Sequence, residues 1–228
     1  MSKVWDTLVE IQWHLVECFS DTGTEVQEPG MDRFNQPGWV NRVWASKDYR
    51  RAHIDVVDAR NTKGLWMMHC CIFPQLHNSA PIFGLDVIAG EKKITGFFHD
   101  YSRTVSENHP MIEAFGDVVS TLEWRKEREL PDWAQAIFSP HMVAAGNVSK
   151  PDELSQITDL SLQSVNAYLE DIKIFNNKAD EQEVKSAQNR YAYYQKQNPH
   201  TPRTMTALGL DDEDVRVFIE DCLFPNID

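Results

Sequence analysis

The sequence predicts an α+β protein, an α/β/α three-layer sandwich in which helices flank a central antiparallel sheet. Strand-like runs follow one another between about residues 39 and 100, and helical patterns precede and follow them. The connections between these runs are short, and a parallel crossover needs about a dozen residues, so neighbouring strands must be antiparallel. The central runs are apolar on both faces, which requires a covering layer on each side.

The first part of the chain supplies a helix and then the sheet. Apolar residues recur at helical spacing over residues 3–19, which predicts an amphipathic helix. Residues 20–38 contain glycines, prolines and acidic residues, so we expect a long loop that crosses to the sheet. Runs of strand length then follow at residues 39–46, 50–58, 65–73, 82–89 and 93–100.

The chain after about residue 105 is predicted to be mainly helical. Residues 138–145 favour one more strand, and the prolines within 198–202 are expected to break the chain. Apolar side chains recur at helical spacing in the other segments, which are 111–121, 150–174, 181–197 and 211–222.

Length and charge limit the possible classes of function. The chain has 228 residues, and we expect residues 1–228 to form a single domain. Its formal net charge of −13 argues against nucleic acid and against an anionic membrane as partners. No apolar run approaches the roughly 18 residues of a membrane span, and the N-terminus lacks a signal-peptide pattern. We therefore expect a cytoplasmic protein with reduced cysteines. A monomer is the separate expectation for its oligomeric state.

Positively charged residues are nevertheless grouped along the chain. The ordinary interpretation of such groups is a solvated edge of the protein. The alternative is a docking surface for a small acidic partner or for the carboxylate of a ligand. The groups are Lys47, Arg50 and Arg51, then Lys92 and Lys93, then Arg125, Lys126 and Arg128.

Two adjacent runs each carry a residue that is unusual inside an apolar sheet. His69 lies in the run 65–73 and Asp86 in the run 82–89, with a polar, proline-bounded connection between them. If this hairpin closes symmetrically, paired residue numbers sum to about 155, which places His69 directly opposite Asp86. Opposed residues on one face have Cβ atoms roughly 4.5–5.5 Å apart.

An imidazole beside a carboxylate in apolar surroundings can hold and release a proton as one unit. Burial raises the pKa of a carboxyl group, and the neighbouring acid helps the histidine to retain its proton. Such a pair is suited to donating protons near neutral pH. The alternative is a structural ion pair inside the sheet, and the residues alone leave both interpretations open.

Other chemistry has weaker support. His53 and Asp55 share one face of the run 50–58, but they have no partner at metal-ligand spacing, so we expect no metal site. The sequence contains no nucleotide-binding or nucleophile motif, so electrons for a redox reaction would have to come from outside. Further histidines are expected at the surface, namely His77, His99, His109, His141 and His200.

The ordered motifs of the chain resemble those of the ferredoxin-dependent bilin reductases. The likeness covers nearly the whole chain, and the 17-residue separation of His69 and Asp86 matches the histidine and the central aspartate of that family. The motifs, in order, are His69-Cys70, Phe73-Pro74, the segment PIFGLDVIAG at 81–90, Arg128-Glu129-Leu130-Pro131-x-Trp133, and Ser149-x-Pro151.

This resemblance implies a sheet sandwiched by helices, with biliverdin IXα, an open-chain tetrapyrrole, bound between the sheet and the C-terminal helices. It implies no bound metal or organic cofactor. Reduced ferredoxin supplies single electrons, the pigment passes through radical states, and the protein supplies the protons. Because ferredoxins are acidic, the basic groups become candidates for ferredoxin docking.

Matched by position, the catalytic candidates are His69, Asp86, Asn198 and Asp55, with Asp86 as the main proton donor. Asn198 lies near the position of an acidic residue in some members, in a loop that closes over the pocket. The asparagine and the Pro199 that follows it depart from that pattern.

The resemblance also implies a set of substrate-binding residues. Arg128 matches an arginine that binds a propionate, and a guanidinium group suits a carboxylate. Thr95 falls where a serine or a similar residue assists that contact. His200 and Arg203 are assigned to the other propionate.

The likeness is to the branch that makes phycocyanobilin, and within it to a compact, phage-borne variant that makes phycoerythrobilin. The branch has a glutamate, tied to reduction of the exocyclic vinyl group, where this chain has Asp55. Aspartate is shorter by about 1.5 Å, and proton transfer needs about 2.6–3.2 Å between heavy atoms. We therefore expect phycoerythrobilin, formed through 15,16-dihydrobiliverdin. The alternatives are phycocyanobilin synthesis and a non-catalytic bilin carrier.

Overall fold

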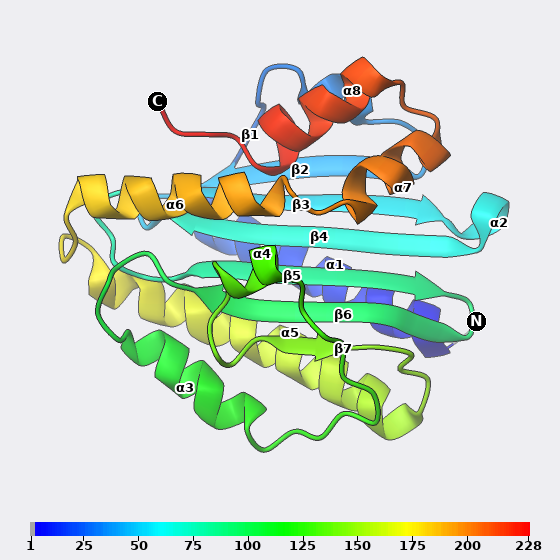
Figure 1. Ribbon diagram of the computed structural model, residues 1–228, viewed down its shortest axis with the longest axis horizontal. Coiled ribbons are helices and arrows are strands. Elements are labelled where there is room, and N and C mark those ends of the chain that lie inside the picture. Colours follow the sequence, from blue (N-terminus) through cyan, green and yellow to red (C-terminus); the bar gives the residue numbers. More distant parts are fainter. Residues whose placement is uncertain (1–2) are drawn as a thin grey trace.

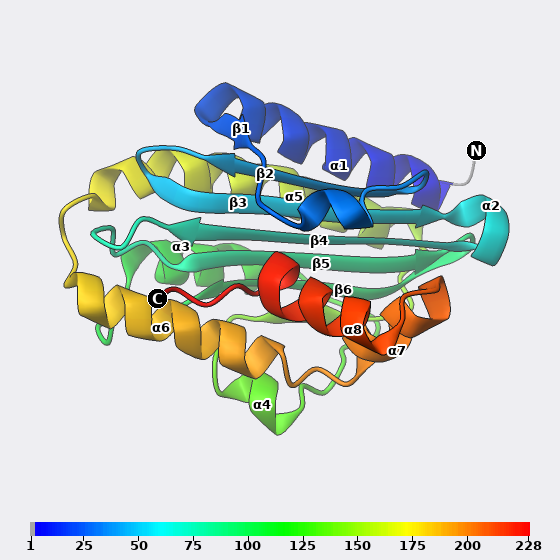
Figure 2. The same ribbon diagram turned by 90° about the horizontal axis from the view of Figure 1, so that it is seen from above.

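The computed structural model describes residues 3–228 and confirms the predicted α+β sandwich. Over this range, seven strands form one sheet in chain order, and each strand is antiparallel to the next. Helices lie on both sides of the sheet (Figures 1 and 2). The strands are β1 (Thr24–Val26), β2 (Trp39–Ala45), β3 (Tyr49–Ala59), β4 (Leu65–Pro74), β5 (Ile82–Gly90), β6 (Lys93–Ser102) and β7 (Val143–Ala145).

The helices divide between the two faces of the sheet. One face is covered by α1 (Lys3–Thr22), α3 (Pro110–Val119) and α5 (Pro151–Asp171). The other is covered by α4 (Asp132–Gln135), α6 (Glu181–Gln195), α7 (His200–Leu208) and α8 (Asp212–Val217). Shorter elements are α2 (Arg60–Lys63), the 3-10 turns Met31–Phe34 and Ile172–Phe175, and the π-helix Phe218–Leu223. Across residues 3–228, no helix combines the length and apolar character needed to cross a bilayer.

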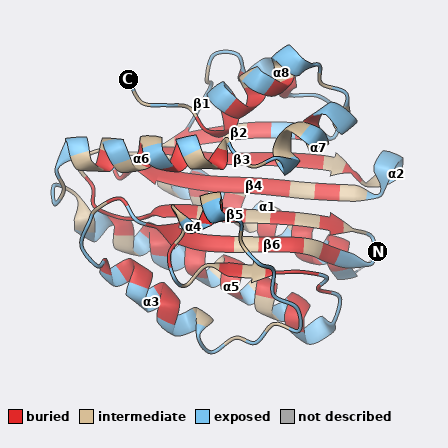
Figure 3. Cartoon of the chain, in the orientation of Figure 1, coloured by how far each residue is buried: buried red, intermediate tan, exposed pale blue. Residues whose placement is uncertain are grey.

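Each face of the sheet has its own apolar core. Alternate residues of a strand point to opposite faces, so strands that are apolar throughout supply both cores. The first core joins the sheet to α1 and α5 and includes Leu8, Trp44 and Phe97. The second joins it to the C-terminal helices and includes Trp39 and Phe218. Figure 3 shows the result: the strands are mostly buried, and exposed residues lie on the outer sides of the helices.

The predicted strand at 138–145 is wrong in its first part. Only the last residues of this segment, in β7, pair with β6. The backbone N–H and the hydroxyl of Ser139 both donate to the buried Asp100 carboxylate. These bonds draw the segment over the face of the sheet instead of along its edge.

The predicted chain break at 198–202 is confirmed only in its first part: the chain leaves α6 after Gln195, but α7 already begins at His200. Pro202 lies in the first turn of this helix, where a missing N–H would have no intrahelical partner in any case. The side-chain oxygen of Asn198 accepts a hydrogen bond from the backbone N–H of His200 at 3.0 Å. The prolines therefore help to start a helix here.

The predicted loop at 20–38 contains two short elements, β1 and the 3-10 turn. β1 is exposed along its whole length but pairs with β2, where Arg42 binds Glu25 at 2.7 Å. This cross-strand ion pair holds a segment whose sequence has no strand pattern.

Candidate active site

The candidate site lies on the face of the sheet that the C-terminal helices cover. Four polar side chains stand in one row across neighbouring strands: Asn41 on β2, Asp55 on β3, His69 on β4 and Asp86 on β5. The predicted pairing of His69 with Asp86 is confirmed. Directly opposed residues of antiparallel strands share a face, so Asp55 lies on the same face as His69.

His69 and Asp86 form a hydrogen-bonded pair at the centre of this row. Nδ1 of His69 lies 2.7 Å from Oδ1 of Asp86. The side chain of His69 is 9% exposed, whereas that of Asp86 is 38% exposed. The imidazole is thus held inside the protein, and the carboxylate remains accessible to a ligand.

The surroundings favour a protonated His69. Burial disfavours the charged ring, but the electrostatic attraction of Cys71 and Asp86, together with the hydrogen bond to Asp86, outweighs it. The net effect holds the pKa of His69 well above its ordinary value. The ring therefore retains its proton more readily than a free imidazole, in the hydrogen bond that joins it to Asp86.

Asp55 is a second carboxylate of the row, with different surroundings. It is 1% exposed, and its Oδ1 accepts a hydrogen bond from the indole N–H of Trp39 at 2.6 Å. Burial raises the pKa of Asp55 to about 7, with the charge of Asp86 acting in the same direction. The Trp39 hydrogen bond and the charge of His69 oppose this rise.

His53 lies two residues before Asp55 on the same face and is fully buried. Its Nε2 lies 3.1 Å from the side-chain oxygen of Asn41. Burial, and then the nearby charges of Arg51 and His69, hold the pKa of His53 well below its ordinary value. Among the residues described, Nδ1 of His53 and Nε2 of His69 have no hydrogen-bond partner. Buried polar atoms of this kind are uncommon, so this face has unused polar capacity.

Aromatic side chains from the C-terminal part pack on the pair and beside it. The ring of Phe224 lies edge-on to His69, with centroids 5.2 Å apart, and the hydroxyl of Tyr191 lies 3.6 Å from the sulfur of Cys71. Tyr191 also lines a cavity of about 560 Å³ at one end of the same face, together with Arg103, Ser139 and Arg190. Its volume is in the range of small-molecule sites, but neither His69 nor Asp86 lines it.

Arg128 approaches the site from the other side of β5. Its guanidinium carbon lies 5.5 Å from the centre of the Phe98 ring, and Phe98 pairs directly with Asp86. Residue 96 is a glycine, and a Cβ atom at this position would lie 2.9 Å from Nη1 of Arg128. The missing side chain therefore makes room for the guanidinium group. Nη1 also lies 3.5 Å from the carbonyl oxygen of Thr95, whose hydroxyl donates to Ile88 at 3.0 Å.

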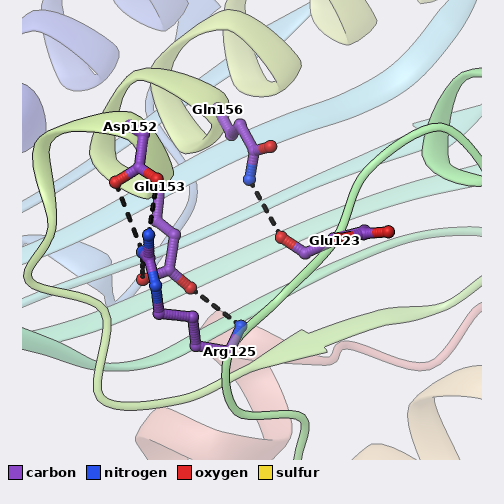
Figure 4. Close-up of polar contacts among 5 residues, drawn as sticks. All are labelled: Glu123, Arg125, Asp152, Glu153 and Gln156. Atoms are coloured by element: carbon purple, nitrogen blue, oxygen red, sulfur yellow. Dashed lines mark hydrogen bonds and ion pairs between the residues drawn. The ribbon is translucent and has the colours of Figure 1, made fainter.

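The segment that carries Arg128 is fixed by an ion-pair cluster (Figure 4). Arg125 binds Asp152 and Glu153 at the start of α5, at 2.6 Å each, and its backbone N–H donates to Glu153. The backbone N–H of Arg128 then donates to Ala144 in β7 at 2.8 Å. Arg125 is therefore engaged by acidic side chains of its own chain.

The remaining candidates lie around α7. Asn198 is half-buried and its side-chain oxygen accepts from the first N–H of this helix, while His200 and Arg203 are exposed in its first turns. In the part of the chain that the structure describes, no hydrogen bond joins these residues to His69 or Asp86. Figure 1 places α7 over the end of β3 and β4, across the sheet from β7.

No group of three or more histidine, cysteine or acidic side chains within residues 3–228 could hold a metal ion. The row Asn41–Asp55–His69–Asp86 is thus a set of hydrogen-bonding and proton-holding groups.

Comparison with known proteins assigns the chain to a family. The model of the ferredoxin-dependent bilin reductases matches residues 10–225. The chain belongs to this family. It is therefore an oxidoreductase that carries out ferredoxin-dependent reduction of a bilin.

Similar bilin reductases extend over most of the chain. A phycocyanobilin:ferredoxin oxidoreductase of Synechococcus sp. (strain CC9902) is 28% identical over 194 residues, which cover 82% of this chain and 75% of that protein. The enzyme of the same name from Gloeobacter violaceus is 26% identical over 189 residues, covering 81% and 73%.

Solved structures agree with the fold of this bilin reductase. The structure of PcyX is similar with a TM-score of 0.74 and 36% identity, over 97% of this chain and 99% of that chain. The structure of tomato phytochromobilin synthase in complex with biliverdin is similar with a TM-score of 0.74, over 94% of this chain and 81% of that chain. The two sequences are 15% identical, so this likeness shows the common fold alone.

Several residues of this bilin reductase differ from the sequence-based expectation. His99 and His109 are buried, not at the surface, because His99 binds the Gly84 carbonyl and the Ser164 hydroxyl and His109 caps α3. Arg51 is 1% exposed and belongs to no solvated edge. Trp39 and Tyr191 were not foreseen, because only the strand register and the helix docking bring them to the site. Side chains alternate between the two faces of a strand, so the pairing register of β2 with β3 is enough to place Trp39 on the same face as Asp55.

Proposed function

We propose that this bilin reductase converts biliverdin IXα to phycoerythrobilin through 15,16-dihydrobiliverdin. The conversion takes four electrons, which reduced ferredoxin delivers one at a time, and four protons. The observation that carries the proposal is the 2.7 Å bond between the buried His69 and the accessible Asp86. In this pair His69 holds a proton, and Asp86, which is bonded to it, can donate a proton to a flat pigment on the sheet.

In this proposal Asp86 donates protons to the pigment, and His69 passes its own proton to Asp86 along their hydrogen bond. Each electron from ferredoxin increases the basicity of the pigment, so proton transfer from Asp86 follows electron transfer. Holding the donor in place lowers the barrier because no diffusive encounter is needed. The raised pKa of His69 helps the ring to retain its proton.

The substrate-binding residues follow the same geometry. Arg128, beside Phe98 and close to Asp86, would bind one propionate of biliverdin, supported by the carbonyl of Thr95. His200 and Arg203, exposed at the start of α7, would meet the other propionate. Asn198 would act by placing the start of α7, whose first N–H donates to its side chain. We propose biliverdin as the substrate because the complex of tomato phytochromobilin synthase holds it in the same fold.

Two observations favour phycoerythrobilin over phycocyanobilin. The acid at position 55 is an aspartate, and its carboxylate is hydrogen-bonded to Trp39 inside the protein. The similarity to PcyX also extends over 97% of this chain and 99% of that chain, whereas the similarity to the Synechococcus enzyme covers 75% of that protein. Both support a compact variant that has lost reduction of the vinyl group.

Product analysis tests the proposal directly. Purified protein, biliverdin IXα and chemically reduced ferredoxin are combined without oxygen, and the pigments are separated by chromatography against authentic standards. We expect 15,16-dihydrobiliverdin to appear first and phycoerythrobilin to accumulate. Recovery of phycocyanobilin alone would reject the argument from Asp55, and recovery of unchanged biliverdin would reject turnover.

A further inference from the structure

Trp39 has a polar contact that the proposed mechanism leaves without a role. Its indole N–H donates to Oδ1 of Asp55 at 2.6 Å, and both side chains are buried, at 2% and 1% exposure. A hydrogen bond from a buried donor to a carboxylate stabilises the charged form of that acid. Trp39 therefore influences both the direction and the protonation of Asp55.

The indole is held firmly in this position. Its ring lies 5.1 Å from the ring of Phe218 and 6.3 Å from that of Phe34, measured between centroids. Phe218 belongs to the C-terminal π-helix and Phe34 to the 3-10 turn before β2. Because both aromatic neighbours belong to other elements, Trp39 cannot turn away from Asp55 without disturbing two further segments.

The bond also orients Asp55 across the sheet. β2, which carries Trp39, flanks β3 on the side opposite to β4 and β5, which carry His69 and Asp86. Throughout residues 3–228, Asp55 accepts no hydrogen bond from His69, although the two residues are directly opposed. The carboxylate is thus turned toward β2.

Other ionisable groups surround Asp55 and contribute to its electrostatic environment. They come from its own strand and from each element packed on this part of the sheet. These groups are His53 and Arg51 on β3, His69 and Cys71 on β4, Asp86 on β5, Glu28 beside Arg51, and Cys222 in the π-helix.

We propose that Trp39 is a positioning residue that favours the charged form of Asp55 and keeps its carboxylate turned toward β2, and thereby withholds it from proton donation to the pigment. The proposal rests on the proposed function in one respect, the loss of vinyl reduction. It gives that loss a second cause besides the length of the aspartate side chain. Reducing a vinyl group to an ethyl group takes two electrons from ferredoxin and two protons, one of which a released Asp55 would supply and the other the His69–Asp86 pair.

An infrared pH titration of the unliganded protein tests the proposal independently of turnover. The carboxyl C=O band that is missing from Asp55→Asn identifies protonated Asp55, and in the wild type its midpoint is expected near pH 7. Trp39→Phe keeps an aromatic ring between Phe34 and Phe218 but removes the N–H. We expect the midpoint to rise by about one to two pH units, the effect of a lost hydrogen bond to a charged group.

Trp44→Phe is the matched control. Trp44 is also a buried tryptophan of β2, but it faces the other core and packs on Phe19. We expect it to leave the Asp55 midpoint unchanged. If Trp39→Phe does not fold, the wild type supplies the test by NMR, since one indole N–H resonance should titrate with Asp55 and stop doing so in Asp55→Asn. An unmoved midpoint in Trp39→Phe, or indole resonances that ignore Asp55, would overturn the proposal.

The product supplies the second readout. With reduced ferredoxin and biliverdin, Trp39→Phe should form vinyl-reduced pigment that the wild type does not form, and Trp39→Phe combined with Asp55→Asn should not. If the wild type itself makes phycocyanobilin, the proposed product is wrong, and the infrared midpoint still decides whether Trp39 positions Asp55. If the midpoint rises but the product of Trp39→Phe is unchanged, Trp39 does not withhold Asp55.

Discussion

Three aspartates on one face of the sheet have the same chemistry but different surroundings. Asp86 is accessible and bound to His69, Asp55 is buried and bound to Trp39, and Asp100 is buried between the hydroxyls of Ser102 and Ser139. Burial raises the pKa of Asp55 and of Asp100, although hydrogen bonds oppose the rise in both. Differences of this kind let carboxylates of one site take separate roles.

The raised pKa of Asp55 predicts a particular dependence of stability on pH. Between its ordinary value of 3.8 and about 7, the folded state holds a proton that the unfolded state has lost. Stability from this group is therefore greatest at low pH and declines as pH rises toward 7. Asp55→Asn keeps an acceptor for the Trp39 N–H but cannot ionise. We expect it to abolish this decline, which amounts to a few kcal/mol in the free energy of unfolding.

Urea unfolding at several values between pH 5 and pH 8 measures this effect. The exposed Asp132 supplies the control, since Asp132→Asn should leave the wild-type slope in place. Parallel stability curves for the wild type and Asp55→Asn would show that Asp55 does not titrate in this range.

At the scale of elements, Arg51 joins three segments beside the site. Its guanidinium binds the Glu28 carboxylate through two bonds of 2.8 and 2.7 Å and donates to the Cys222 carbonyl at 2.6 Å. It thus ties β3 to the chain before the first 3-10 turn and to the π-helix. The π-helix leads directly to Phe224, which packs on His69.

We expect Arg51→Met to lower the free energy of unfolding by about 3 kcal/mol, since it leaves a partly buried acid without its partner. Arg42→Met is the matched control. Arg42 binds Glu25 with the same two-bond geometry, but its side chain is 31% exposed against 2% for Arg51. Its loss should cost less than about 1 kcal/mol. Equal losses in denaturant titrations would contradict the role given to burial.

The Arg125 cluster is a second link between elements, and under the proposed function it bears on substrate binding. Arg125→Met removes the side-chain ion pairs between α5 and the segment that carries Arg128, so the guanidinium of Arg128 is held less firmly. We expect KM for biliverdin to rise by about two- to fivefold with little change in kcat, as befits an exposed ion pair. Lys126→Met removes an equal charge from the same segment and should leave KM near the wild-type value. A matching rise in Lys126→Met would assign the effect to net charge.

At the scale of the whole molecule, the sequence is sufficient to predict the sheet, both helical layers and the opposed His69 and Asp86. The hairpin between β4 and β5 is local, and its register follows from one short connection. Strands that are buried on both faces have continuous apolar sequences, which can be recognised directly. The family likeness then supplied the remaining candidates.

The other parts of the site depend on contacts between distant segments. Trp39 reaches Asp55 because β2 pairs with β3, and Phe224 reaches His69 because the chain end returns to the sheet. The sequence pattern predicts that Arg51 lies at the surface, but in the folded protein Glu28 and the π-helix enclose its side chain. The sequence pattern does not predict α7, because its prolines favour a break, whereas the Asn198 side chain binds the first N–H of a new helix.

The central claim is that the His69–Asp86 pair supplies protons to the pigment. It is tested most directly by following the absorption of biliverdin bound to Asp86→Asn as reduced ferredoxin is added without oxygen, beside the wild type. The account predicts normal pigment binding, but a stalled radical or unreduced pigment and turnover at least about 100-fold slower. Formation of the wild-type product at the wild-type rate by Asp86→Asn would contradict it.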